Sequence, residues 1–170
     1  MEQDTINTII STLKEERIDL VVTLPEEPTA PLTEEIRRDA YFKSITVAGE
    51  NHGLSLCAGA SIGGRRCVFV TGIAGLFVGA WSLAQMGVLY GIPLLIIASY
   101  RGDIGDRSGI SGAQLFMFQQ LGEPLLNALR VPYRIVAKKD DLQRQLRDAH
   151  FACREYGTPL VLLLTGEVLW

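Results

Sequence analysis

Apolar positions along this chain follow two spacings in turn, one typical of strands and the other typical of helices. Short runs rich in β-branched and aliphatic residues predict six strands, at residues 20–24, 42–48, 67–71, 92–99, 133–136 and 160–165. Between these runs, apolar residues recur every three or four positions and predict helices at residues 4–17, 32–39, 50–62, 76–90, 113–129 and 141–155. Strands that alternate with helices predict an α/β fold, with a parallel six-stranded sheet and helices on both faces.

The segment 67–100 contains no charged residue, so its length raises the alternative of a membrane-spanning helix. Gly72 interrupts the segment early, and Gly91 with Pro93 interrupts it again. A strand, a helix and a second strand explain the three parts, because parallel strands covered on both faces consist of continuous apolar runs. We therefore expect no membrane segment here.

The composition indicates one globular domain. The 170 residues are 48% hydrophobic and 21% charged, which argues against disorder, and no linker or repeat divides them. The net charge of −3 gives no support to nucleic-acid binding, which normally needs a basic surface. The three cysteines predict buried thiols in a reducing cytoplasm, and the polar N-terminus does not resemble a signal peptide.

One carboxylate is notable for its position. Glu50 follows the strand predicted at 42–48 and falls in the first turn of the next helix. Ligands of open α/β sheets bind at the carboxyl ends of the strands, so Glu50 is a candidate for a functional site. The alternative is structural, because an acid in the first turn also complements the helix dipole. The helix continues with small residues such as Gly53 and Gly59, which let another backbone approach closely.

A glycine-bearing turn is predicted after the third strand. Gly72 and Gly75 end that strand and open a helix, but the turn has neither a P-loop lysine nor the Gly-x-Gly-x-x-Gly spacing. It therefore favours a flat ligand against the backbone over a nucleotide phosphate. No group of acids or cysteines has metal-ligand spacing, so we expect no metal ligand from this chain.

Cationic candidates follow the fourth strand. Arg101 and Arg107 flank a glycine-rich loop and suit an anionic ligand group, or else pair with acids of the loop. His52, two residues after Glu50, is either an acid–base or anion-binding group or an exposed polar residue. His150 is expected on the surface of the last helix.

Residues 49–53, together with the small residues 58–60, resemble the pyrimidine-binding (Pyr) domain of thiamine-diphosphate enzymes. Residues 71–75 and 93–102 match as well, and the order of strands and helices agrees over essentially all 170 residues. The segment Ser99-Tyr100-Arg101-Gly102 narrows the resemblance to the separate α subunit of sulfopyruvate decarboxylase and to the related phosphonopyruvate decarboxylases.

The resemblance implies roles for particular residues. Glu50 would hydrogen-bond a ring nitrogen of the aminopyrimidine and promote its imino form, which activates thiamine diphosphate for attack on a 2-oxo acid. The cofactor-binding residues implied are Glu50, Thr71, Gly72, Ile73 and Ala74. The candidates for binding a second anionic group on the substrate, such as the sulfonate of 3-sulfopyruvate, are His52, Arg101 and Arg107.

The resemblance also implies a half-enzyme. In the family, a second (PP) domain holds the diphosphate and the magnesium ion, so we expect one Pyr domain in residues 1–170 and the PP domain on a partner (beta) subunit. The expected assembly is a cytoplasmic hetero-oligomer with Pyr–Pyr pairing that decarboxylates a 2-oxo acid. The alternatives are a two-chain carboligase, a non-catalytic α/β assembly module and a nucleotide-binding domain with phosphate at residues 72–75.

Two positions depart from the family pattern. Relatives usually carry a small polar pair after the proline of the first loop, whereas this chain has Glu26 and Glu27 after Pro25. Two carboxylates at this place would repel a dianionic substrate unless they point outward. The turn after Thr71 also lacks the asparagine common in relatives. The resemblance therefore defines the cofactor better than the substrate.

Overall fold

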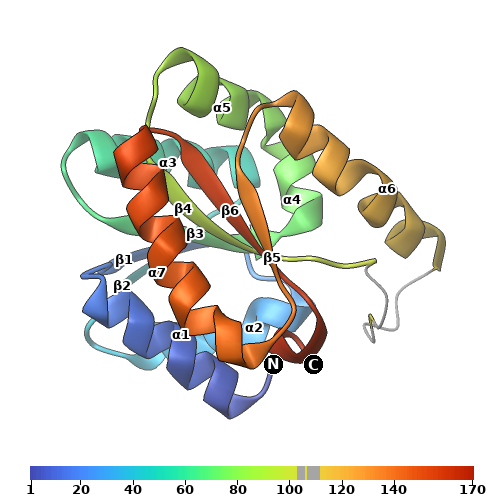
Figure 1. Ribbon diagram of the computed structural model, residues 1–170. Coiled ribbons are helices and arrows are strands. Elements are labelled where there is room, and N and C mark those ends of the chain that lie inside the picture. The colour runs from blue at the N-terminus through green and yellow to red at the C-terminus, as the bar shows by residue number, and fades with distance from the viewer. Residues whose placement is uncertain (103–105, 107–111) are drawn as a thin grey trace.

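The computed structural model describes residues 1–102, 106 and 112–170. Its strands form one sheet in the order β2-β1-β3-β4-β6-β5, and every neighbouring pair is parallel (Figure 1). The strands are β1 (Leu20–Thr23), β2 (Lys43–Thr46), β3 (Cys67–Gly72), β4 (Leu94–Ser99), β5 (Tyr133–Val136) and β6 (Pro159–Leu164). The predicted six-stranded parallel sheet is confirmed.

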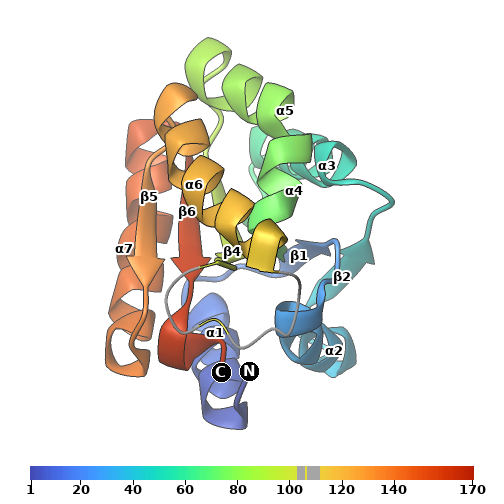
Figure 2. The same ribbon diagram turned by 90° about the vertical axis from the view of Figure 1, so that its right-hand side faces the viewer.

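Helices cover both faces of this sheet, as predicted. The helices are α1 (Gln3–Glu15), α2 (Ala30–Arg38), α3 (Glu50–Ile62), α4 (Ile73–Val78), α5 (Ala80–Ala84), α6 (Gly112–Ala128) and α7 (Lys139–Tyr156). One core cluster joins the sheet to α1, α2 and α7, and a second joins its other face to α3, α4, α5 and α6. The three layers can be followed in Figure 2, where the two chain termini also lie close together.

The central strands are apolar because both of their faces are covered. Every residue of β3, β4 and β6 is buried. Along β4, Leu95 and Ile97 pack into one core cluster while Leu94 and Ile96 pack into the other. Alternating side chains on a strand point to opposite faces, so a strand between two helix layers needs a continuous apolar run. The uncharged runs of β3 and β4 thus follow from burial. Among the described residues, no helix is long and apolar enough to cross a membrane.

The connections create a topological switch point at the carboxyl edge of the sheet. From β1 the chain passes through α2 on one face to reach β2, whereas from β3 it continues into α4 on the other face. Two neighbouring strands whose connections leave on opposite faces define the switch point at which open α/β sheets bind ligands. The carboxyl ends of β1 and β3 are therefore the first place to look for a site.

The loop after β1 is more regular than its prolines suggest. A short 3₁₀ turn, η1 (Glu27–Thr29), leads directly into α2, which begins at Ala30, two residues earlier than predicted. Pro31 lies in the first turn of α2, where its missing N–H costs no hydrogen bond. Thr33 does not cap this helix, because its hydroxyl donates to the Ala30 carbonyl from inside the helix at 3.0 Å.

The helix predicted at 76–90 is broken into three pieces. Strand β3 runs on through Gly72, and α4 starts at Ile73 without a separate turn. A break follows at Gly79, after which come α5 and a π-helical turn, η2 (Gln85–Leu89). A Cβ atom on Gly79 would lie 2.4 Å from Leu54 Cδ1 of α3, so the break lets α3 pack closely there. By contrast, α6 continues through Pro124 without interruption.

Candidate functional site

Glu50 is the first residue of α3, and Gly49 before it is extended (φ −170°). Three residues separate it from Thr46, the last residue of β2. The prediction of an acid at a strand-to-helix junction is therefore correct as a placement. Its side chain is half-buried and lies at the positive end of the helix dipole.

The Glu50 side chain fills a space left by a glycine of α4. A Cβ atom on Gly75 would lie 2.6 Å from Glu50 Cγ and 2.8 Å from Glu50 Oε1. The same Cβ would lie 2.6 Å from Thr71 Oγ1, at the end of β3. The carboxylate of Glu50 and the buried hydroxyl of Thr71 therefore converge on Gly75, although they come from different elements of the chain.

The Glu50 carboxylate has no partner within the described ranges. Its side chain makes neither a hydrogen bond nor an ion pair with any residue there. A carboxylate that is half-buried and unpaired keeps both oxygens available to a ligand. The arrangement can therefore accept a hydrogen bond from, or share a proton with, a polar group placed against α4.

A second carboxylate, which the sequence pattern only flagged as a departure, points into the same edge. Glu26, in the loop after β1, lies against Gly72: a Cβ atom there would come within 2.2 Å of Glu26 Oε2. Its side chain is only 22% exposed. Glu27 next to it is exposed. Of the two acids, Glu27 therefore points outward and Glu26 points toward the carboxyl edge.

Arg101 joins these acids to the end of β4. Its Nη2 donates to Glu27 Oε2 at 2.9 Å, and its Nε lies 3.9 Å from Glu26 Oε2. The Arg101 side chain is 11% exposed, and Ser99 two residues earlier is fully buried. The predicted anion-binding arginine is thus at the carboxyl edge, where acids of the β1 loop already contact it.

Three buried polar atoms at this edge lack a hydrogen-bond partner of good geometry within the described chain: Glu26 Oε1, Ser99 Oγ and Arg101 Nε. Burial raises the pKa of Glu26, and the nearby Ser99 hydroxyl and Arg101 guanidinium oppose the rise. Buried polar groups are nearly always hydrogen-bonded. These three unpaired atoms at the carboxyl edge of the sheet are therefore available to a bound molecule.

Three of the remaining predicted residues, Ile73, Ala74 and His52, belong to helices that begin at this edge. Ile73 is buried beneath α6, with its Cδ1 3.1 Å from where a Cβ on Gly122 would be, while Ala74 is exposed. His52 is exposed on α3, two residues after Glu50, and its ring lies near Gly49. Arg107 lies outside the described residues.

One expectation is corrected. His150 was expected on the surface, but it is 3% exposed, with Nδ1 2.6 Å from Glu16 Oε2. The sequence of α7 alone could not indicate this, because α1 supplies the cover. Ser99 and the inward side chain of Glu26 were not recognised as site residues either, and Gly75 was recognised only as part of a glycine-bearing turn. The available signal was their position, since each lies at or just after the carboxyl end of a strand.

The fold and the site together define the class: a parallel α/β protein with an unpaired carboxylate at the switch point of its sheet. No group of three His, Cys, Asp or Glu within the described residues could hold a metal ion.

Comparison with known proteins gives a specific match. No family model matches this chain. Three individual proteins, each named sulfopyruvate decarboxylase subunit alpha, are similar to it in sequence. That of Methanococcus maripaludis is 27% identical over 147 residues, which cover 86% of each chain. The protein of Methanothermobacter thermautotrophicus is 28% identical over 79% of each chain. The protein of Methanocaldococcus jannaschii is 24% identical, and the match covers 91% of this chain and 89% of the relative. The resemblance to this alpha subunit is confirmed.

A solved structure has the same fold. It is a 2-oxoglutarate:ferredoxin oxidoreductase from Magnetococcus marinus with 2-oxoglutarate, coenzyme A and succinyl-CoA bound. The match has a TM-score of 0.70 at 14% sequence identity, and covers 98% of this chain but only 29% of that one. At this identity the likeness concerns the fold alone.

Proposed function

We propose that this chain is the alpha (Pyr) subunit of a two-chain, thiamine-diphosphate-dependent decarboxylase of a 2-oxo acid that carries a second anionic group, as 3-sulfopyruvate does. The observation that carries the proposal is the unpaired Glu50 carboxylate on Gly75, in a chain similar to three sulfopyruvate decarboxylase alpha subunits. Residues 1–170 would form one Pyr domain, and the partner's PP domain would hold the diphosphate and the magnesium ion.

The residues present fit an aminopyrimidine ring. Gly72 and Gly75 carry no side chain, so the carboxylates of Glu26 and Glu50 lie directly against their backbone, and Ala74 between them is exposed. A ring placed against this segment would meet these two carboxylates and the Thr71 hydroxyl, which can hydrogen-bond its nitrogens. Glu50 would hold a ring nitrogen, and Thr71 to Ala74 would line the ring. When bound, the cofactor supplies the electron sink for loss of carbon dioxide from the 2-oxo acid.

In this proposal, Glu50 acts by holding a proton. Its carboxyl group would donate to the ring nitrogen, which shifts the ring's protonation toward the form that carries a basic imino nitrogen. The half-buried setting keeps water from competing for this hydrogen bond, and an interaction of lower effective dielectric is stronger than the same one in water. Glutamine in place of Glu50 can hydrogen-bond, but cannot exchange the proton.

The second anionic group of the substrate would be bound by cations of the same edge. Arg101 is the best candidate, because guanidinium groups bind sulfonate and carboxylate through two parallel hydrogen bonds. Its present partner Glu27 is 68% exposed, so that carboxylate can turn to solvent when an anion binds to Arg101. Glu26 would oppose an anion only when ionised, and its raised pKa reduces that opposition. His52 and Arg107 are the further candidates.

A partner subunit is supported by exposed apolar surface. Large apolar side chains that are more than 60% exposed lie along α4, α5 and η2: Val78, Trp81, Val88, Leu89 and Tyr90. Beside them, a groove of about 550 Å³ separates the small-residue side of α3 (Ser55, Ala58, Gly59) from α5 and η2. A surface of this kind marks an interaction site, and we propose that the PP subunit or a second Pyr subunit covers it.

The test is to co-express the chain with the partner encoded beside it. Carbon dioxide release from 3-sulfopyruvate and 3-phosphonopyruvate is measured with and without thiamine diphosphate and magnesium. Release that needs both chains and the cofactor supports the proposal. Glu50→Gln should then lower turnover by about 10²- to 10⁴-fold, the range typical of a positioned acid–base group.

The matched control is Glu34→Gln, which removes an exposed acid of α2 and should leave turnover unchanged. Complex formation is followed by size-exclusion chromatography for every variant. A complex that forms normally but releases carbon dioxide equally with Glu50 and with Gln at this position would contradict the catalytic role. A complex without any cofactor binding would favour the non-catalytic assembly module.

A further inference from the structure

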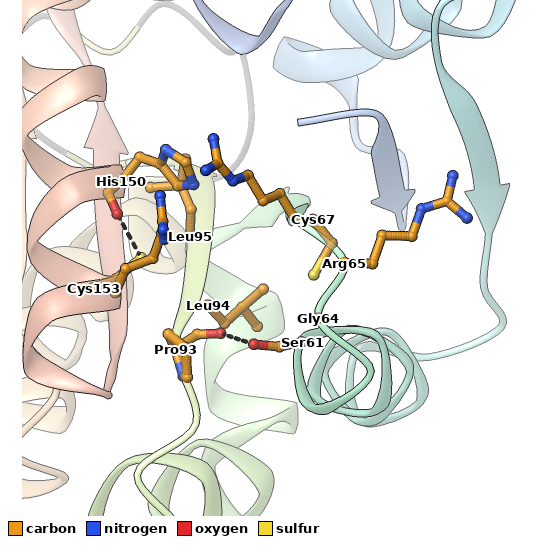
Figure 3. A pocket seen from close by; sticks show the side chains of 11 residues that line it. Ser61, Gly64, Arg65, Cys67, Pro93, Leu94, Leu95, His150 and Cys153 are labelled. Atoms are coloured by element: carbon orange, nitrogen blue, oxygen red, sulfur yellow. Dashed lines mark hydrogen bonds between the residues drawn. The ribbon is translucent and has the colours of Figure 1, made fainter. Parts of the chain in front are cut away.

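A cavity lies at the opposite edge of the sheet from Glu50. Its volume is about 320 Å³, and it opens between the end of α3, the first residues of β3 and β4, and α7 (Figure 3). The residues that matter for its chemistry are Ser61, Arg66, Cys67, Pro93, His150 and Arg154. None of them belongs to the site proposed for the cofactor.

The length of β3 separates the two sites. Cys67, the first residue of β3, lines the cavity, whereas Gly72, its last residue, lies at the carboxyl edge beside Glu26. At about 3.3 Å per residue the ends of this strand are about 17 Å apart. A small molecule cannot contact both, so the cavity is a separate site.

The cavity has an excess of positive charge. Three arginines line it, of which Arg65 is paired with Asp19 at 2.9 Å and extends away from His150 in Figure 3. Arg66 donates from Nη1 to the backbone carbonyl of Glu16 at 2.8 Å. Within the described chain, neither Arg66 nor Arg154 makes an ion pair. Two guanidinium groups without an ion pair thus line one cavity of a protein whose net charge is −3, and the Glu16 carboxylate that contacts His150 offsets part of their charge.

His150, in the wall of the cavity, is affected by the positive charge of these arginines. Burial lowers the pKa of His150, and the positive charges of Arg154 and Arg66 lower it further, against the opposing effect of Glu16. The imidazole is 3% exposed and its Nδ1 is held by the Glu16 carboxylate. Both arginines therefore act on a ring whose position is fixed.

We propose that this cavity binds the oxyanion of a small molecule, a phosphate, sulfonate or carboxylate, between Arg66 and Arg154. Guanidinium groups match such oxyanions in geometry and hold them by charge-assisted hydrogen bonds. The Ser61 hydroxyl at the cavity is already used, because it donates to the Pro93 carbonyl at 2.9 Å, so the two arginines carry the recognition.

The remaining lining suits a short carbon skeleton. Pro93, Leu94 and Leu95 form an apolar wall at the start of β4. A volume of about 320 Å³ lies at the lower end of the range for small-ligand cavities, which are mostly apolar with a few placed polar groups. We therefore expect an organic anion of about three or four carbons to bind more tightly than the inorganic ion.

The binding test uses the full chain and isothermal titration calorimetry at constant ionic strength. Inorganic phosphate and glycerol 3-phosphate are the two probes. We expect saturable binding of one equivalent, with the organic phosphate the tighter ligand. Arg66→Gln and Arg154→Gln should each weaken it at least tenfold. The matched control is Arg144→Gln, which removes the same charge from an exposed position on the same helix.

The second readout does not depend on any arginine variant. The chain has two histidines, so His52→Gln leaves His150 as the only imidazole signal in NMR. A saturating phosphate probe should raise the pKa of His150, because a nearby anion stabilises the imidazolium. Absence of saturable binding would overturn the proposal. So would an equal loss of binding in Arg144→Gln, or a His150 signal that does not respond to either probe.

Discussion

The carboxyl group of Glu50 occupies the space that a side chain on Gly75 would fill. The two residues belong to α3 and α4 and lie 25 positions apart in the sequence, yet a Cβ atom on Gly75 would come within 2.6 Å of Glu50 Cγ. Gly75 has no unusual backbone angle that would require glycine. Its role is steric: it leaves room for the carboxylate beside Thr71.

Gly75→Ala should therefore displace the Glu50 carboxylate without unfolding the protein. The end of a glutamate side chain can move, and alanine is favoured over glycine inside a helix by about 1 kcal/mol. We expect at least a tenfold loss of cofactor affinity and of carbon dioxide release by the two-chain complex, with an unchanged circular dichroism spectrum. Glu34→Gln on α2 is the control, because it changes an exposed side chain far from Gly75 in the sequence. Equal activity of the two variants would contradict the steric role of Gly75.

Gly53→Ala should destabilise the fold itself. A Cβ atom at this position of α3 would lie 2.4 Å from the ring of Phe69, which is fully buried in β3 and cannot move aside. Overpacking a core costs about 1–3 kcal/mol and outweighs the gain in helix propensity. Urea unfolding should show a net loss of about 1–2 kcal/mol, whereas Gly59→Ala on the same helix should be neutral or stabilising. A Gly53→Ala variant as stable as the wild type would show that α3 can shift.

Glu26 should make the stability fall as the pH rises. Burial raises its pKa in the folded protein, so the folded state binds the proton more tightly than the unfolded state. That contribution is complete below the unfolded pKa, near 4.5, and is lost as the pH rises through the folded pKa. Melting temperatures between pH 4 and pH 8 should show this loss in the wild type and not in Glu26→Gln. The exposed neighbour gives the control, since Glu27→Gln should leave the pH dependence in place.

His150 should have the opposite effect. Its pKa in the folded protein is lowered by burial, so its contribution is present above the unfolded pKa, near 6.5, and is lost as the pH falls through the folded pKa. Unfolding free energies measured from pH 8 down to pH 5 should decline in the wild type more steeply than in His150→Gln. The exposed His52 provides the comparison. If His52→Gln flattened the profile and His150→Gln did not, the buried imidazole would not be the titrating group.

The period of the apolar positions was enough to predict the sheet. The three central strands are buried on both faces, so each had to be a short continuous apolar run, and this pattern does not depend on where the neighbours lie. The junction at Glu50 could be predicted for the same reason. A strand followed by a helix puts the residue between them at the carboxyl edge, whatever the order of the strands.

Features that depend on contacts between distant segments could not be predicted. The break at Gly79 relieves a contact with Leu54 of another helix, and His150 is buried because α1 brings Glu16 to it. Glu26 points inward because Gly72 leaves space for its carboxylate at the end of a neighbouring strand. No local pattern records such a contact, since each partner is ordinary in its own segment.

The sequence by itself thus determined the elements, their alternation and the carboxylate at the strand-to-helix junction, because these follow from the periodicity of burial and from local backbone chemistry. Only the tertiary structure decided which residues meet. It put Glu50 with Thr71 on Gly75, set Glu26 against Gly72, and gathered Arg66 and Arg154 around a cavity. The physical reason is that the order of strands in the sheet, and not the distance along the chain, sets which side chains share a space.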